Sequence, residues 1–401
     1  RTLRQQPGVL RVDRVGARYE MSSQPDYLND PYFDGHNTQP PGQPAGPLFA
    51  SPTYPGQWDM HIIGMENVFG YRNSGNSVPA NPGALGSASV RLAIIDTGAD
   101  VSLTDIGPAN SPRIVRTQCF ITPSGGVQSH TQNVSDFDGH GTNVTGIAAA
   151  NTNNGFGFVG SGGNVSLMIY RIFPSGANSS ASSADEVAAI NDAIQNGANI
   201  ISLSLGSSQQ DPSEGAAIAN AIQNKVTVVA AAGNEKATAL DFPAGYPGVI
   251  AVGASAIDDK GTERVASYSN YVPGSTTWGL IAPGGDPTLP AANDSDFLHW
   301  IENAYSLRAE QPCRAASGGT DFFGESGNCN VLIAGTSQAT PHVAGAVAML
   351  FSVKGVMDPA SVKQALLAST HDITDPKQGA GRLNEYRLIA TALNDPNPPP
   401  K

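Results

Sequence analysis

Four polar side chains of the kinds used in acyl transfer border apolar runs of this sequence. Asp96 closes the apolar run 90–95, His140 lies between two glycines, and Ser337 opens a strongly apolar segment. Asn234 comes directly after another apolar run. A serine hydroxyl is a poor nucleophile at neutral pH and needs an adjacent base, which in turn needs a carboxylate to hold its tautomer. An amide can donate to the oxyanion that forms. Together the four residue types indicate nucleophilic catalysis by serine.

Each of these residues also has a purely structural explanation. Asp96 and Asn234 follow predicted strands, where both residue types are common in turns. Ser337 precedes a predicted helix, where serine is a usual N-cap. His140 between glycines is also compatible with simple packing. The chemical interpretation therefore depends on all four residues being brought to one place.

The elements that would do this alternate between strand and helix. Strands are expected at 90–95, 165–172, 199–204, 226–232 and 249–254, and helices at 141–150, 183–196, 213–224, 336–353, 359–369 and 384–393. Such alternation predicts an α/β fold, a three-layer doubly wound and mainly parallel sheet with helices on both faces. Functional residues of such sheets gather beyond the carboxyl ends of the strands.

The composition excludes several classes of protein. The 401 residues include 22 Lys and Arg against 34 Asp and Glu, a net charge of −12, without a long basic run, which argues against nucleic-acid binding. No stretch of about 18 apolar residues is present, so no membrane span is predicted. The hydrophobic share of 40% is too high for a disordered chain. The low charged share of 14% is common in secreted proteins, and an extracellular location is predicted.

Several blocks of the sequence resemble the subtilisin-like serine peptidases (subtilases). They are IIDTGAD, DFDGHGTNVTGIAAA, ISLSLG, VVAAAGNE and IAGTSQATPHVAGAVAML, in that order. The resemblance implies a subtilisin-like fold and a secreted, monomeric serine endopeptidase that acts on proteins or peptides and is inhibited by its own propeptide. It implies that Asp96 orients His140, that His140 is the general base and then acid, and that Ser337 is the nucleophile. Asn234 and the Ser337 N–H would form the oxyanion hole.

The same resemblance assigns substrate contacts. Ser204, Leu205 and Gly206 would form an edge strand to which an extended peptide adds. Ala231, Ala232 and Gly233 would line the opposite wall of the pocket for the residue before the scissile bond. Two positions depart from the family pattern. Asp241 stands at the base of that pocket, where it either favours Lys or Arg substrates or turns to solvent or binds a cation. Gln338 replaces the oxidisable Met that many subtilisins carry.

Calcium is the expected cofactor, in a structural role. The resemblance assigns Asp105 as a carboxylate ligand and residues 151–159 as a calcium loop. The remaining ligands would be the Asn154 side chain, the carbonyls of Thr152, Phe156 and Phe158, and Gln57. All are oxygen donors, which calcium prefers. The alternative is a Gly- and Asn-rich hairpin that holds no ion.

The predicted organisation is one enlarged catalytic domain. Residues 1–56 are expected to be an N-terminal extension that includes a propeptide remnant, and residues 394–401 a Pro-rich tail or linker. The peptidase domain would span 57–393, with an insertion at about 284–330 near the nucleophile. Cys313 and Cys329 of that insertion are expected to pair, although two free thiols are the alternative.

Two other functions share this sequence pattern. A dedicated processing peptidase or a peptide ligase would use the same residues, because in a ligase an amine resolves the acyl-enzyme instead of water. A non-catalytic binding homologue is disfavoured, since all four chemical residues are present. Related peptidases that use Glu as the base are disfavoured by the His140-Gly141-Thr142 block.

Overall fold

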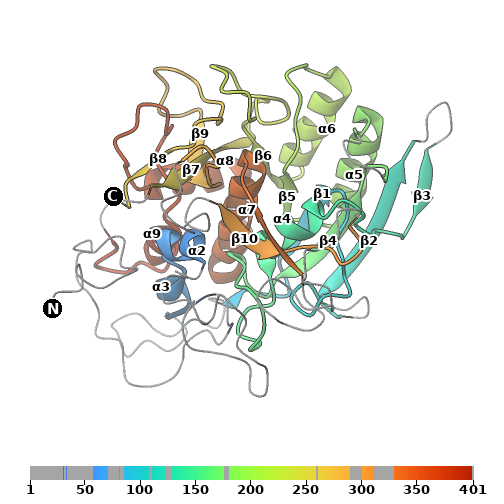
Figure 1. Cartoon of the computed structure of the whole chain (residues 1–401), viewed down its shortest axis with the longest axis horizontal. Helices are drawn as coiled ribbons and strands as arrows, with labels where there is room; N and C mark the ends of the chain where they lie inside the picture. Colours follow the sequence, from blue (N-terminus) through green and yellow to red (C-terminus); the bar gives the residue numbers. More distant parts are fainter. Residues whose placement is uncertain are drawn as a thin grey trace.

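The computed structural model describes residues 30, 33, 57–70, 81, 85–107, 111–122, 128–175, 180–258, 261–289, 300–309 and 329–399. A nine-stranded sheet crosses the molecule in the order β3-β2-β4-β1-β5-β6-β7-β8, with β9 also paired to β7 (Figure 1). The strands are β1 (Arg91–Asp96), β2 (Ile114–Ile121), β3 (Ser129–Thr131), β4 (Ser166–Arg171), β5 (Ile200–Leu203), β6 (Thr227–Ala231), β7 (Ile250–Ile257), β8 (Glu263–Val265) and β9 (Gly279–Pro283). All pairings are parallel except those of β3 and β8.

Helices cover both faces of this sheet. The two on one face are α5 (Ser183–Gln195) and α6 (Pro212–Gln223), and the other face carries α4 (His140–Ala149), α7 (Thr336–Lys354), α8 (Pro359–Ser369) and α9 (Glu385–Ala392). Strand β1 shows why both faces need a cover: successive side chains along a strand point to opposite faces of the sheet, and both sets are apolar here. Leu92 and Ile94 belong to the core beside α7, whereas Ala93 and Ile95 belong to the core beside α5 and α6. The predicted three-layer α/β fold is confirmed.

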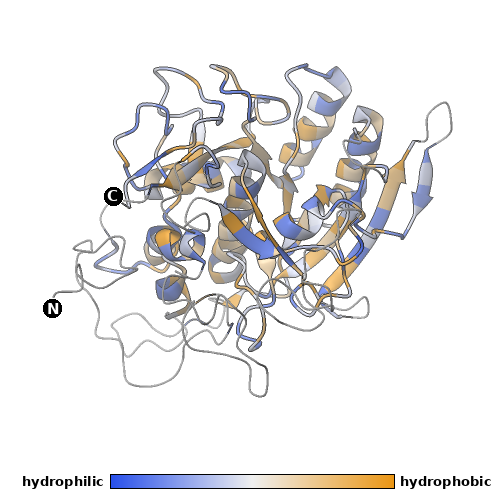
Figure 2. Cartoon of the chain, in the orientation of Figure 1, coloured by the Kyte–Doolittle hydropathy of each residue, from blue (hydrophilic) through white to orange (hydrophobic). Residues whose placement is uncertain are grey.

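Helix α7 runs through the centre of the molecule (Figure 1). Nearly all of its residues are buried, and Figure 2 shows apolar residues concentrated on it and on the strands. A helix that is apolar all round belongs in a core. Among the described residues, no single helix is long and apolar enough to cross a membrane, although α7 and α8 pass that test jointly as a bent pair, by length and composition alone.

The predicted strands and helices are all present, within one or two residues of the expected bounds except for β7, which is longer. Several elements were not expected: β2, β3, β8, the short helices α2 (Trp58–Ile63) and α3 (Met65–Gly70), and a hairpin of β10 (Ile301–Ala304) and β11 (Asn330–Ile333). Strand β2 was not predicted because only two of its eight residues are buried, so it does not form an apolar run in the sequence.

Part of the predicted organisation lies outside the described residues. This holds for the propeptide remnant in residues 1–20, for most of the N-terminal arm and for much of the insertion. Cys329 is buried, but its predicted partner Cys313 is outside the described part, so that pairing stays a prediction. Cys119 is a free, buried thiol.

Candidate active site

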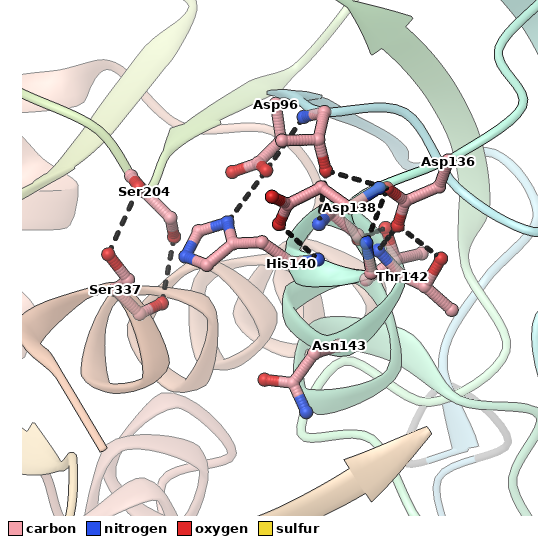
Figure 3. A network of polar contacts seen from close by, with 12 residues as sticks. Asp96, Asp136, Asp138, His140, Thr142, Asn143, Ser204 and Ser337 are labelled. Atoms are coloured by element: carbon pink, nitrogen blue, oxygen red, sulfur yellow. Dashed lines mark hydrogen bonds and ion pairs between the residues drawn. The ribbon is translucent and has the colours of Figure 1, made fainter. Parts of the chain in front are cut away.

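Asp96 and His140 form a short ion pair at the carboxyl edge of the sheet. Asp96 is the last residue of β1 and is 1% exposed, while His140 is the first residue of α4. The distance from His140 Nδ1 to Asp96 Oδ1 is 2.7 Å, and the Thr97 N–H also donates to Oδ1 at 2.7 Å. A carboxylate acceptor requires the proton to be on Nδ1, so Nε2 of the neutral ring is an acceptor. Figure 3 shows the ring reaching from Asp96 towards Ser204 and Ser337.

Several carboxylates surround His140. Burial lowers the pKa of His140, but the charge and hydrogen bond of Asp96 and the charges of Asp138 and Asp136 outweigh it and raise this pKa to about 9. Asp136 is fully buried and accepts the N–H groups of Gly139 and Thr142 at 2.8 Å each. The loop before α4 is thus tied to a buried carboxylate. This fixes the backbone position from which the His140 side chain extends.

Ser337 lies in the first turn of α7, beside the end of β5. Its Oγ donates to the Ser204 carbonyl at 3.1 Å, and Ser204 Oγ donates to the Ser337 carbonyl at 2.9 Å (Figure 3). The Ser337 carbonyl can accept this bond because Pro341, four residues later, has no N–H to donate to it. Among the described residues, no hydrogen bond joins Ser337 Oγ to His140. The N-terminus of a 19-residue helix provides a positive potential at this hydroxyl.

Asn234 is held beside this helix start. Its Oδ1 accepts the Thr336 N–H and the Thr336 hydroxyl, both at 2.9 Å. Because the Thr336 N–H can only donate, the atom facing it must be the oxygen, so the amide orientation is fixed. Neither Asn234 Nδ2 nor the Ser337 N–H has a hydrogen-bond partner among the described residues. Two donors are therefore available next to the Ser337 hydroxyl.

The predicted substrate segments flank Ser337, but one expectation about them is wrong. Ser204, Leu205 and Gly206 do not form an edge strand, because β5 lies between β1 and β6 and these residues continue beyond its end. Within the described chain, Leu205 and Gly206 make no backbone hydrogen bonds, so their N–H and C=O groups can still pair with a peptide. On the other wall, Ala231 ends β6, and Ala232 and Gly233 follow it.

Asp241 lies between the two predicted walls of the pocket. It is 8% exposed, so it does not turn out to solvent. A Cβ on Gly206 would lie 3.2 Å from Asp241 Cβ, and a Cβ on Gly233 would lie 2.8 Å from Asp241 Cγ and 2.7 Å from Glu235 Oε2. Burial, and then the charge and hydrogen bond of Glu235, raise the pKa of Asp241 to about 6. The sequence interpretation missed Glu235, although its position directly after Asn234 is a usable signal.

Two of the predicted calcium ligands, Asp105 and Gln57, contact the end of the 151–159 loop. A Cβ on Gly157 would lie 1.8 Å from Asp105 Oδ2, and the Phe158 N–H donates to that oxygen at 2.7 Å. Gln57 binds the backbone of Val159 through both side-chain atoms, at 2.7 and 3.0 Å. Asp105 and Gln57 thus hold adjacent residues of the loop.

The remaining predicted ligands belong to the same loop. Asn154 Oδ1 accepts the Phe156 N–H at 2.9 Å, and the Thr152 carbonyl accepts Asn164 Nδ2 at 3.1 Å. The described residues contain no cluster of three or more His, Cys, Asp or Glu side chains suited to a metal. A single carboxylate with amide and carbonyl oxygens is nevertheless chemistry that suits calcium, so the residues present fit this ion.

The described part of the insertion contacts the loop that precedes His140. The Tyr305 hydroxyl donates to the Asp138 carbonyl at 2.5 Å, and Ser306 Oγ donates to the Asp136 carbonyl at 2.6 Å. The Tyr305 ring packs so closely on Gly139 that an added Cβ there would lie 2.0 Å from it. This contact could not be predicted from sequence patterns, because the two segments are 167 residues apart.

The sequence and the structure both have known relatives. The profile described as the Subtilase family matches residues 87–387. A thermophilic serine proteinase of Bacillus sp. strain AK1 is 31% identical over 76% of this chain and 62% of its own length. Halolysin of Haloferax mediterranei is 33% identical over 78% of this chain and 51% of its own length. The chain thus spans between half and two thirds of these two relatives.

The fold also matches a solved structure. Fervidolysin from Fervidobacterium pennivorans, a keratinolytic enzyme related to subtilisin, has a TM-score of 0.63 and 24% identity, over 86% of this chain and 46% of that chain. At this identity the likeness shows the fold alone. Since the family profile covers most of the sequence, including all the residues from Asp96 to Ser337, the chain belongs to the subtilase family.

Proposed function

We propose that this protein is a secreted serine endopeptidase that hydrolyses peptide bonds of proteins and peptides through an acyl-enzyme on Ser337. The observation that carries the proposal is the 2.7 Å pair of His140 Nδ1 with the buried Asp96, with the imidazole directed at Ser337. The low charged share of 14% supports an extracellular location. The relatives found by sequence include enzymes named as serine proteinases.

The proposed reaction begins with a rotation of the Ser337 hydroxyl from the Ser204 carbonyl to His140 Nε2. As Oγ attacks the substrate carbonyl, Nε2 takes its proton, and Asp96 stabilises the resulting imidazolium. His140 then gives the proton to the leaving amine as the C–N bond breaks. A water molecule, deprotonated by the same nitrogen, attacks the acyl-enzyme, and the proton returns to Ser337 as the acid product leaves.

The oxyanion of each tetrahedral intermediate would be bound by Asn234 Nδ2 and by the Ser337 N–H. Thr336 holds the oxygen end of the Asn234 amide, so the donor end faces away from it, ready before the charge develops. Donors fixed in advance need no reorganisation during the reaction, which is the main source of their effect.

Substrate recognition would combine two contributions. Backbone pairing would accept many substrate sequences, and one pocket would select a particular side chain. An extended peptide would pair with the backbone of residues 204–206, a mode that tolerates many side chains. We infer that Asp241, beside Glu235, selects Lys or Arg before the scissile bond, because a buried carboxylate attracts a cation in a partly dry pocket.

Calcium is proposed as a structural cofactor that would stabilise the loop of residues 151–159. Asp105, Gln57, Asn154 and the carbonyls of the loop would hold it. Bound there, the ion would neutralise the buried charge of Asp105 and would tie α2 to the loop through Gln57. It would take no part in the chemical step.

A cleavage profile on a peptide library tests the proposal. We expect cleavage within peptides at many sequences, with enrichment of Lys and Arg before the cleaved bond. Cleavage of a single motif would instead favour a dedicated processing peptidase. Adding an amine-terminated peptide separates hydrolysis from ligation, because a ligase would give a joined product as its main product. No cleavage of any peptide would contradict a peptidase.

A further inference from the structure

The N-terminal arm inserts one carboxylate into the loop that is proposed to bind calcium. Asp30 is 1% exposed, and its two oxygens accept the N–H groups of Asn153 and Asn154 at 2.6 and 3.1 Å. The Gly155 amide adds a hydrogen bond to the same carboxylate. Three successive backbone amides of the loop, those of residues 153–155, thus point at one side chain from a distant part of the chain.

The loop has the conformation of an anion-binding nest. Asn153, Gly155 and Gly157 have φ of 63°, 76° and 57°, in alternation with their neighbours. Left-handed residues alternating with right-handed ones turn successive N–H groups into one concavity, which binds anions. In this protein the anion is the Asp30 carboxylate.

A second contact fixes the same segment of the arm. Phe33 is 3% exposed and joins the apolar core, with its ring 4.3 Å from the His61 ring of α2. His61 Nε2 also bonds the Phe33 carbonyl at 2.7 Å. Gln57, at the start of α2, binds the end of the calcium loop. The arm segment therefore contacts the calcium loop and also α2, which directly follows the proposed ligand Gln57.

The nest orients the carbonyl groups on the other side of the loop. In a trans peptide the N–H and the C=O point in opposite directions. Because the Asn153 N–H donates to Asp30, the carbonyl of Thr152 points away from Asp30, and this carbonyl is one of the proposed ligands. The Phe158 N–H faces Asp105 at the other end of the loop.

From this arrangement we propose that Asp30 is a positioning residue for calcium: its carboxylate holds the 153–155 amides, so the loop carbonyls are set for the ion before it binds. The proposal rests on the proposed calcium site. It also gives the residues Asp30 and Phe33 a role in supporting the loop, since removing them would leave the 153–155 amides without this acceptor.

Calcium titration of the full chain tests this role. All variants carry Ser337→Ala, so that autolysis cannot occur and the result does not depend on peptidase activity. Asp30→Ala removes the nest anion, and Asp30→Asn keeps one acceptor oxygen without the charge. Asp211→Ala is the matched control, because Asp211 also accepts backbone amides, those of Ser213 and Glu214 at the start of α6. Calorimetry gives the Kd of calcium, and thermal melts with calcium and with EDTA give its effect on Tm.

We expect Asp30→Ala to raise the Kd of calcium at least about tenfold, a factor that corresponds to about 1.4 kcal/mol, with Asp30→Asn between it and the parent. The Tm gained from calcium should shrink in Asp30→Ala and stay unchanged in Asp211→Ala. An unchanged Kd in both Asp30 variants would overturn the positioning role. Equal loss of Tm with calcium and with EDTA would do the same. If the parent itself binds no calcium, the calcium site is wrong, and the role of Asp30 falls with it.

Discussion

Replacement of Asp241 by Asn tests the proposed specificity pocket. The substitution removes one negative charge and keeps the size of the side chain. We expect the ratio of kcat/KM for Arg over Phe substrates to fall sharply, because the carboxylate between Gly206 and Gly233 is the charge that would pair with a cationic side chain. The pairing of Glu235 with Asp241 sets the size and pH range of the effect.

The magnitude follows from the burial of this charge. Two unit charges about 4 Å apart at an effective dielectric constant of about 20 attract by about 4 kcal/mol. Desolvation of the cation and sharing of a proton between Asp241 and Glu235 offset part of this. A net preference of about 1.4–2.8 kcal/mol remains, which corresponds to a factor of about 10–100 in the ratio.

The pH dependence has a defined sign. Since the pKa of Asp241 is raised to about 6, its charge is present above pH 6 and lost below it. The Arg-to-Phe ratio should therefore rise between pH 5 and pH 7. The titration of His140 affects both substrates alike and cancels in the ratio. Glu235→Gln removes a charge that raises this pKa, so the rise should move to lower pH.

The assay uses paired chromogenic peptides that end in Arg or Phe. Asp358→Asn is the control, because Asp358 caps α8 and Asn caps equally well. It should leave the ratio unchanged. Equal or faster cleavage after Phe by the parent at pH 8, or an unchanged ratio in Asp241→Asn, would show that Asp241 does not select a cationic side chain.

Four further outcomes are expected. Asn234→Ala should lower kcat about 10²–10³-fold with little change in KM, the usual effect of removing one oxyanion donor; an unchanged kcat would exclude that role. Initial rates should show kcat/KM rising with pH through about 9, because His140 must be neutral to act as a base and its pKa is about 9. Asp138→Asn removes a charge that raises this pKa, so the rise should shift to lower pH, and a rise that does not move would contradict the assignment. Because Gln338 has no thioether, activity should survive dilute hydrogen peroxide, and rapid loss would count against this. EDTA should lower the Tm in a thermal melt; a constant Tm would remove calcium from the account.

The fold could be predicted well because its central strands and helices are apolar along their length. The strands of the parallel core read as continuous apolar runs, and α7 reads as a long apolar helix, so their bounds needed no tertiary information. Strand β2 lies at the side of the sheet with mixed polarity, and the hairpin of β10 and β11 is joined through a long insertion. Their pairing depends on contacts between segments far apart in sequence.

The positions of the site residues were predictable for a similar reason. Asp96, His140, Asn234 and Ser337 each stand at the end of a strand or the start of a helix, and the parallel sheet brings such ends to one edge. The contacts of Asp30 and Tyr305 were not predictable. Asp30 binds backbone N–H groups, which every residue except proline has, and Tyr305 packs on a glycine. Neither contact therefore requires a characteristic side chain that would identify the partner in the sequence.

Covalent labelling is the most direct test of Ser337 as the nucleophile. The folded protein is treated with phenylmethylsulfonyl fluoride, the modified peptide is identified by mass spectrometry, and residual peptidase activity is followed in parallel. We expect a single sulfonylated residue, Ser337, formed in step with loss of activity and absent in His140→Ala. Labelling that leaves Ser337 unmodified, or peptidase activity that persists in Ser337→Ala, would contradict it.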